Sequence, residues 1–149
     1  MYLVRTEGLN ILIDAGLGDN QNLITLLESL KISPEDINAI LITHLHPDHI
    51  GGIQHHSFPK AKVYLSQAEY DFWMRDVEVG TNTDEVDNRY AIARQMLAML
   101  EGNFVLLSPE ELGKNNTTIF HNIYAIATYG HTPGHTSYLV GPAGNQILI

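Results

Sequence analysis

The sequence predicts a layered α/β fold, in which helices cover the outside of β-sheets. Apolar runs typical of strands alternate with segments of helical periodicity in the first part of the chain. The last part contains strand-like runs separated by turns, which favours antiparallel pairing. A chain of 149 residues, 44% of them hydrophobic, has room for one domain with a core. Sheets with helices outside are the arrangement that such an order of elements favours.

Strands are expected in eight apolar runs, at residues 1–5, 9–13, 37–43, 62–65, 104–107, 118–128, 137–140 and 146–149. Residues 39–42 are apolar on both faces, which indicates a central strand covered on both sides. Helices are expected at residues 20–31, after a Ser66 cap followed three residues later by Glu69, and at residues 90–100. Residues 77–87 are polar and predict a mobile loop.

Composition excludes several classes of function. The net charge of −9 argues against DNA or RNA as the main partner, because no basic surface offsets the phosphate charge. No apolar run approaches the roughly 18–20 residues that span a membrane. The chain has no cysteine but eight histidines, so any metal must be held by imidazole and carboxylate groups.

The strongest chemical signal is residues 44–49 (HLHPDH), directly after the predicted strand at residues 37–43. In extended backbone, side chains two residues apart point the same way, so His44 and His46 can converge on one cation. Pro47 is expected to bend the chain and turn Asp48 and His49 toward a second position. Nitrogen and oxygen ligands without sulfur suit Zn²⁺, and also Mn²⁺ or Fe²⁺.

The HLHPDH run after a hydrophobic strand resembles the metal-binding signature of the metallo-β-lactamase-fold hydrolases, whose fold is an αββα sandwich. Residues 130–136 (GHTPGHT) look like the downstream histidine motif of this family. The local sequence leaves His131 and His135 equally open as a further ligand. The resemblance implies that His131 completes a first metal site with His44 and His46.

The same resemblance implies roles for residues that do not bind metal themselves. Asp14, Thr132 and His135 would orient the ligand loops by hydrogen bonding. Asp48 would bind the second metal with His49 and orient the nucleophile. The implied reaction is hydrolysis of a small-molecule substrate by a hydroxide that two zinc ions activate.

Residues 58–65 and 69–73 narrow the resemblance to the lactonase and methyl parathion hydrolase-like branch. Residues 69–73 lie in a helical insertion expected at about residues 66–102. This branch hydrolyses lactones, esters or phosphoesters. Trp73, with Tyr70 and Phe72, is interpreted as core packing in preference to a substrate platform.

The family pattern continues with a metal-bridging aspartate and a final histidine, which residues up to Ile149 do not include. The opening strands of the family are also short. We therefore expect residues 1–149 to be one partial domain that lacks the C-terminal part of the sandwich. Its first metal site would be complete and its second incomplete, so the chain would bind one metal better than two and hydrolyse weakly.

Two alternatives remain open from the residues. A mono-iron dioxygenase can be built on the same fold. A non-catalytic chain could instead assemble with another chain through the exposed strand edge at residues 146–149. The same edge would allow a homo-oligomer. The remaining histidines, His55, His56 and His121, are expected to face solvent or the rim of a pocket without binding metal.

Overall fold

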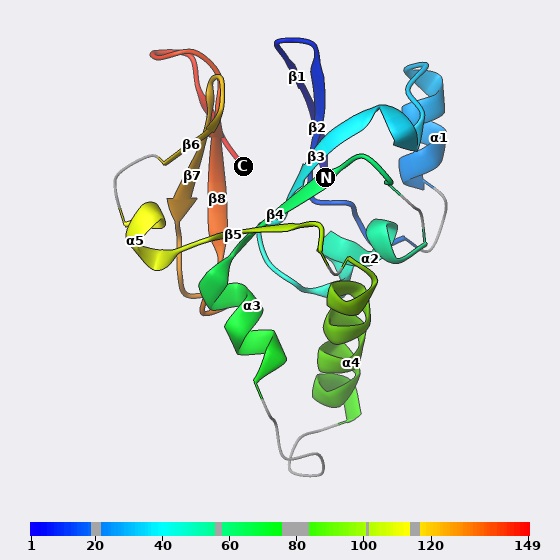
Figure 1. The fold of residues 1–149 in the computed structure, drawn as a ribbon, viewed down its shortest axis with the longest axis vertical. Helices are drawn as coiled ribbons and strands as arrows, with labels where there is room; N and C mark the ends of the chain where they lie inside the picture. The colour runs from blue at the N-terminus through cyan, green and yellow to red at the C-terminus, as the bar shows by residue number, and fades with distance from the viewer. Residues whose placement is uncertain (19–21, 56–57, 76–83, 101, 114–116) are drawn as a thin grey trace.

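The computed structural model describes residues 1–18, 22–55, 58–75, 84–100, 102–113 and 117–149. Two β-sheets lie face to face, and four of the helices cover the outer side of the larger sheet (Figure 1). This mixed arrangement confirms the predicted α/β fold class.

The larger sheet has five strands in the order β1-β2-β3-β4-β5. They are β1 (Tyr2–Thr6), β2 (Leu9–Ile13), β3 (Ile37–Leu41), β4 (Lys62–Ser66) and β5 (Phe104–Leu107). β1 and β2 form an antiparallel hairpin, and the following pairs are parallel. β3 is the middle strand, as its apolar character on both faces predicts.

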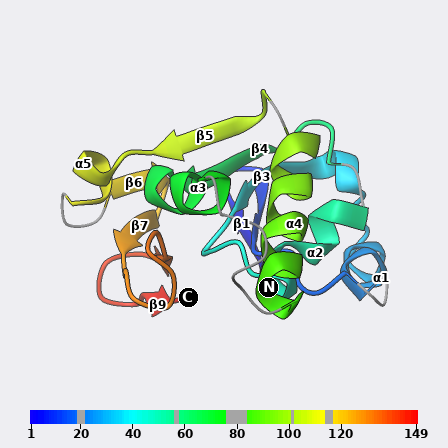
Figure 2. The ribbon, with the colours of Figure 1, turned by 90° about the horizontal axis from the view of Figure 1, so that it is seen from below.

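The smaller sheet is antiparallel and runs in the order β6-β7-β8-β9. Its strands are β6 (Thr117–Phe120), β7 (Ile123–Ala127), β8 (Thr136–Val140) and β9 (Ile147–Leu148). Figure 2 shows this sheet beside the larger one, seen from below. The single strand predicted at residues 118–128 is wrong, because the chain turns back at Asn122. Asn122 has a φ of 58°, a left-handed conformation that asparagine tolerates better than most residues.

The helices are α1 (Asn22–Ser29), the short 3₁₀ helix η1 (Pro34–Asp36), α2 (Pro47–His55), α3 (Gln67–Met74), α4 (Asp84–Met99) and α5 (Pro109–Leu112). Two sequence predictions need correction. Residues 47–55 form α2, a helix that the sequence analysis does not predict; Pro47 occupies its first position, where proline fits without loss of a hydrogen bond. α4 begins at Asp84, six residues before the predicted start, because its polar first turns carry no apolar periodicity. Of the predicted loop at residues 77–87, residues 77–83 fall outside the described residues. Residues 84–87 form the first turn of α4.

Two apolar cores lie on the two faces of the larger sheet. Along β3 and the residue after it, Ile40 and Ile42 enter the core beneath the helices, and Ala39 and Leu41 enter the core between the sheets. Each core joins segments far apart in the chain, such as Leu27 of α1 with Met96 of α4. The carboxyl ends of β3 and β4 and the β7–β8 loop therefore come together at one end of the sheets. None of the helices among the described residues is long and apolar enough to pass through a membrane.

Candidate metal centre

The predicted ligand residues lie where three segments meet. His44 and His46 follow β3, Asp48 and His49 lie in the first turn of α2, and His131 belongs to the loop between β7 and β8 (Figure 1). Open α/β sheets place ligands at this carboxyl end of their parallel strands.

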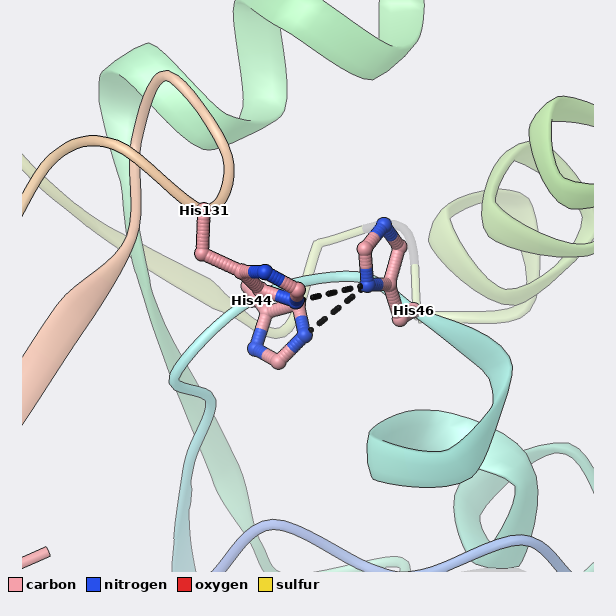
Figure 3. A group of neighbouring side chains, drawn as sticks. All are labelled: His44, His46 and His131. Carbon is pink, nitrogen blue, oxygen red and sulfur yellow. Dashed lines mark hydrogen bonds between the residues drawn. The ribbon is translucent and has the colours of Figure 1, made fainter. Parts of the chain in front are cut away.

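His44, His46 and His131 form a cluster in which three ring nitrogens face one another (Figure 3). His46 Nδ1 lies 3.1 Å from His44 Nε2 and 3.1 Å from His131 Nε2. In a tetrahedral zinc site with Zn–N bonds near 2.05 Å, neighbouring nitrogens are about 3.3 Å apart. His44 is buried, His46 half-buried and His131 exposed, so the cluster is open on the His131 side. These residues fit a zinc ion.

Asp48 and His49 form a second, smaller group beside the first. His49 Nε2 is 3.5 Å from Asp48 Oδ2, and the His49 ring lies 4.0 Å from that of His44 between centroids. Within the residues that the structure describes, no third histidine or acidic side chain joins this pair closely enough to hold an ion with it. The pair offers two ligands for a second cation.

The Asp14 side chain helps to orient both the three-histidine cluster and the Asp48–His49 pair. Its buried carboxylate accepts hydrogen bonds from Thr43 N (2.9 Å) and Thr43 Oγ1 (2.9 Å) and contacts His49 Nδ1 at 2.7 Å. Because the Thr43 hydroxyl donates its hydrogen bond to Asp14, its oxygen can only accept from His44 Nδ1, which lies 3.0 Å away. Both rings thus carry a proton on Nδ1, which leaves the Nε2 atom of His44 with a free lone pair.

Burial decides the protonation of His44 and His46. Burial, together with the charges of the neighbouring histidines, lowers the pKa of His44 to about 2. Burial likewise lowers the pKa of His46. The hydrogen bond that His49 donates to Asp14 raises the pKa of His49, because the carboxylate stabilises the imidazolium. His44 and His46 therefore keep neutral imidazoles, the form that binds metal.

His135 lies near the cluster but faces another partner. Its Nδ1 is 2.8 Å from Thr128 Oγ1, and its backbone oxygen accepts from Thr128 N at 3.0 Å. Its ring centroid is 5.0 Å from that of His44, and burial lowers its pKa. Of the two histidines that the local sequence left open, the structure brings His131 to the ligand group and keeps His135 at the base of the β7–β8 loop.

Glu69 is a site residue that the sequence analysis missed. The Ser66 cap is confirmed, with Ser66 Oγ accepting from Glu69 N at 3.4 Å, but the Glu69 side chain is fully buried between the ligand loops. Thr132, which the resemblance placed among the supporting residues, donates to Glu69 at 2.6 Å. The sequence signal at Glu69 is that of an ordinary helix cap, so a buried role could not be distinguished from it.

A pocket of about 160 Å³ opens beside the cluster. It is lined by His46, Phe72, Trp73, Arg89, Tyr90, His131, Thr132 and Pro133. Trp73 is 3% exposed, which confirms its predicted place in the core, yet its ring also lies 5.6 Å from that of His46 between centroids. Helices α3 and α4 thus supply an apolar wall next to the three-histidine cluster.

The other histidines lie apart from the cluster or cannot be placed. His121 is in the turn between β6 and β7, with its Nδ1 3.9 Å from Glu7 Oε1 and both side chains exposed. The side chain of His55, and His56 as a whole, fall outside the described residues.

Comparison with known proteins assigns the chain to a protein family. The family model described as "Metallo-beta-lactamase superfamily" matches residues 1–149. The uncharacterized protein YobT of Bacillus subtilis (strain 168) is 30% identical over 141 residues, covering 93% of this chain and 55% of YobT. An N-acyl homoserine lactonase of Bacillus cereus is 25% identical, covering 93% of this chain and 56% of the lactonase.

Among solved structures, the hydrolase AbOPH of the beta lactamase superfamily has a TM-score of 0.80 at 30% identity, covering 99% of this chain and 53% of AbOPH. AidC, a dizinc quorum-quenching lactonase, has a TM-score of 0.83 at 25% identity, with 98% of this chain and 53% of AidC covered. The chain spans about half the length of the curated relatives it matches.

Proposed function

Since the chain belongs to the metallo-beta-lactamase superfamily, we propose that it acts as a zinc-dependent hydrolase of lactones or related carboxylic esters. The observation that carries the proposal is the convergence of His44, His46 and His131, with nitrogen separations of 3.1 Å. Its neighbours in sequence and structure are hydrolases of this superfamily, including lactonases.

Zinc is the ion that the donor set favours. Imidazole is a common zinc ligand, and His44, His46 and His131 would supply the three protein ligands that catalytic zinc sites use. A cation bound by these three histidines would act as a Lewis acid that activates water and the substrate carbonyl. Asp48 and His49 would hold a second cation, which the dizinc lactonase AidC also supports.

The chain's own residues have separate tasks in this proposal. Asp14 holds the His49 ring through Nδ1 and so aims its Nε2 toward Asp48. The Asp48 side chain is 66% exposed and can accept a hydrogen bond from the attacking water, which orients it toward the carbonyl. Phe72, Trp73 and Tyr90 provide the apolar contact for the non-reacting part of the substrate.

The lactone class is favoured over phosphotriesters because two of the named relatives are lactonases. The test compares hydrolysis of an N-acyl homoserine lactone, an aryl ester and an aryl phosphotriester by the zinc-loaded chain, measured by proton release. We expect the lactone to be cleaved fastest. A preference for the phosphotriester would overturn the lactone assignment, while iron retention with oxygen uptake would favour a dioxygenase.

The ligand assignment is tested with single variants. His44→Ala, His46→Ala and His131→Ala should each lower kcat/KM by at least 100-fold, since removal of one of three ligands leaves the cation weakly held. His121→Ala is the matched control, because His121 lies in an exposed turn. Activity that survives all three ligand substitutions would refute the proposed site.

A further inference from the structure

We infer that Glu69 is a positioning residue that joins the two ligand loops of the metal centre into one rigid unit. The inference rests on the proposed function, because it assigns Glu69 to the same three-histidine site. Glu69 acts through the Leu45 backbone next to His46, and through Thr132 and Gly134 beside His131.

The carboxylate of Glu69 accepts four hydrogen bonds. Oε1 accepts from Leu45 N at 2.9 Å and from Trp73 Nε1 at 2.6 Å. Oε2 accepts from Thr132 Oγ1 at 2.6 Å and from Gly134 N at 3.1 Å. Leu45 lies between His44 and His46, and Thr132 directly follows His131, so one side chain connects loops that are more than 80 residues apart in the chain.

The burial of Glu69 cannot be explained by its helix cap. A carboxylate that is 0% exposed is destabilising unless its acceptor sites are filled, and here four donors fill them. Glu111 occupies the same place in a second Ser-x-x-Glu cap, but there the exposed side chain turns back and accepts from Ser108 N at 2.7 Å. The inward turn of Glu69 is therefore a feature of the site and not of the cap.

The His131 loop is packed directly on the first turn of α3. A Cβ atom at Gly134 would lie 2.0 Å from Glu69 N and 2.4 Å from Glu69 Cα. Glycine at this position lets the loop backbone approach closely enough for Gly134 N to reach the carboxylate. The close approach and the hydrogen bonds together set the distance between His131 and His46.

The variant Glu69→Gln separates the two halves of this connection. Its amide oxygen can accept from Leu45 N and Trp73 Nε1, and its amide group can donate to the Thr132 hydroxyl, which also accepts. Gly134 N–H then faces a donor and is left unpaired. The opposite orientation leaves two pure donors unpaired, so it is disfavoured. We therefore expect the loop of His131 to be released and the loop of His46 to stay in place.

The first experiment measures zinc affinity of the full chain by competition with a chelator. Glu69→Gln should weaken zinc binding by about tenfold or more, as is typical of residues that orient metal ligands, and Glu111→Gln should leave it unchanged. In a His131→Ala background, the effect of Glu69→Gln should fall to within about twofold, because the ligand through which it acts is gone. An equal loss in both backgrounds would show a general structural role and overturn the inference.

The second experiment needs no metal. Amide hydrogen exchange of the metal-free wild type should show that Leu45 N–H and Gly134 N–H are both protected. In Glu69→Gln, Gly134 N–H should lose its protection while Leu45 N–H keeps it. The single tryptophan of the chain gives one indole N–H resonance, which should stay protected in both proteins. Rapid exchange of Gly134 N–H in the wild type would overturn the inference even if the variant fails to fold.

The two proposals fail in different ways. If the wild type binds zinc and Glu69→Gln binds it equally well, the role of Glu69 is refuted and the proposed function stands. If the wild type binds no zinc while both amides stay protected, the proposed metal function is refuted, and the metal role of Glu69 with it.

Discussion

Replacing Gly134 by alanine is expected to move His131 away from His46, because the new methyl group would overlap the backbone of α3. The Cβ atom would lie 2.0 Å from Glu69 N, whereas ordinary contacts begin near 3.4 Å, so the loop must withdraw by about 1.4 Å. The two nearest atoms, Glu69 N and Cα, are backbone and cannot rotate away. The perturbation therefore acts on the loop as a whole.

The magnitude follows from this overlap. Overpacking of this kind lowers the free energy of unfolding by about 1–3 kcal/mol, or roughly 3–10 °C in Tm for a chain of this size. The same displacement would lengthen the distance between His46 Nδ1 and His131 Nε2 from 3.1 Å to about 4.5 Å, beyond the roughly 3.3 Å of a tetrahedral zinc site. We expect zinc affinity to fall at least tenfold.

The assay is differential scanning calorimetry of the metal-free chain together with zinc competition against a chelator. Gly113→Ala is the matched control, since Gly113 has a φ of −75° and its added Cβ would come no nearer than 3.1 Å to any neighbouring atom. A Gly134→Ala protein with the Tm and zinc affinity of the wild type would refute the packing of the His131 loop against α3.

Two further predictions concern the metal and the pH. The chain should retain one tightly bound zinc per molecule by emission spectroscopy, because Asp48 and His49 give the second cation two ligands among the described residues; two tight equivalents would contradict this. Stability of the metal-free chain should fall as the pH drops below 6.5, since unfolded His44 then takes up a proton that folded His44, with a pKa of about 2, does not. The slope from this residue reaches about 1.4 kcal/mol per pH unit. His46 and His135 act in the same direction, while His49, with its raised pKa, contributes stability that is lost only as the pH rises through that value. A Tm that is constant from pH 6.5 to 4.5 would disprove this account.

Much of the fold follows from local patterns. The apolar run at residues 39–42 predicts a central strand, and β3 is the middle strand of the larger sheet. The errors occur where local pattern and tertiary environment diverge. The turn at Asn122 interrupts an otherwise continuous strand-like run, and the first turns of α4 have no apolar periodicity to mark them.

The sequence by itself indicated the chemistry of the candidate site, because the residue types and the two-residue spacing of His44 and His46 are local properties of a short segment. Only the tertiary structure decided which later histidine meets them, since the position of His131 depends on the packing of the β7–β8 loop against α3. It also decided that Glu69 is buried between the loops while Glu111, in the same local motif, faces solvent. Hydrogen bonds between segments more than 60 residues apart leave no periodic trace in the sequence.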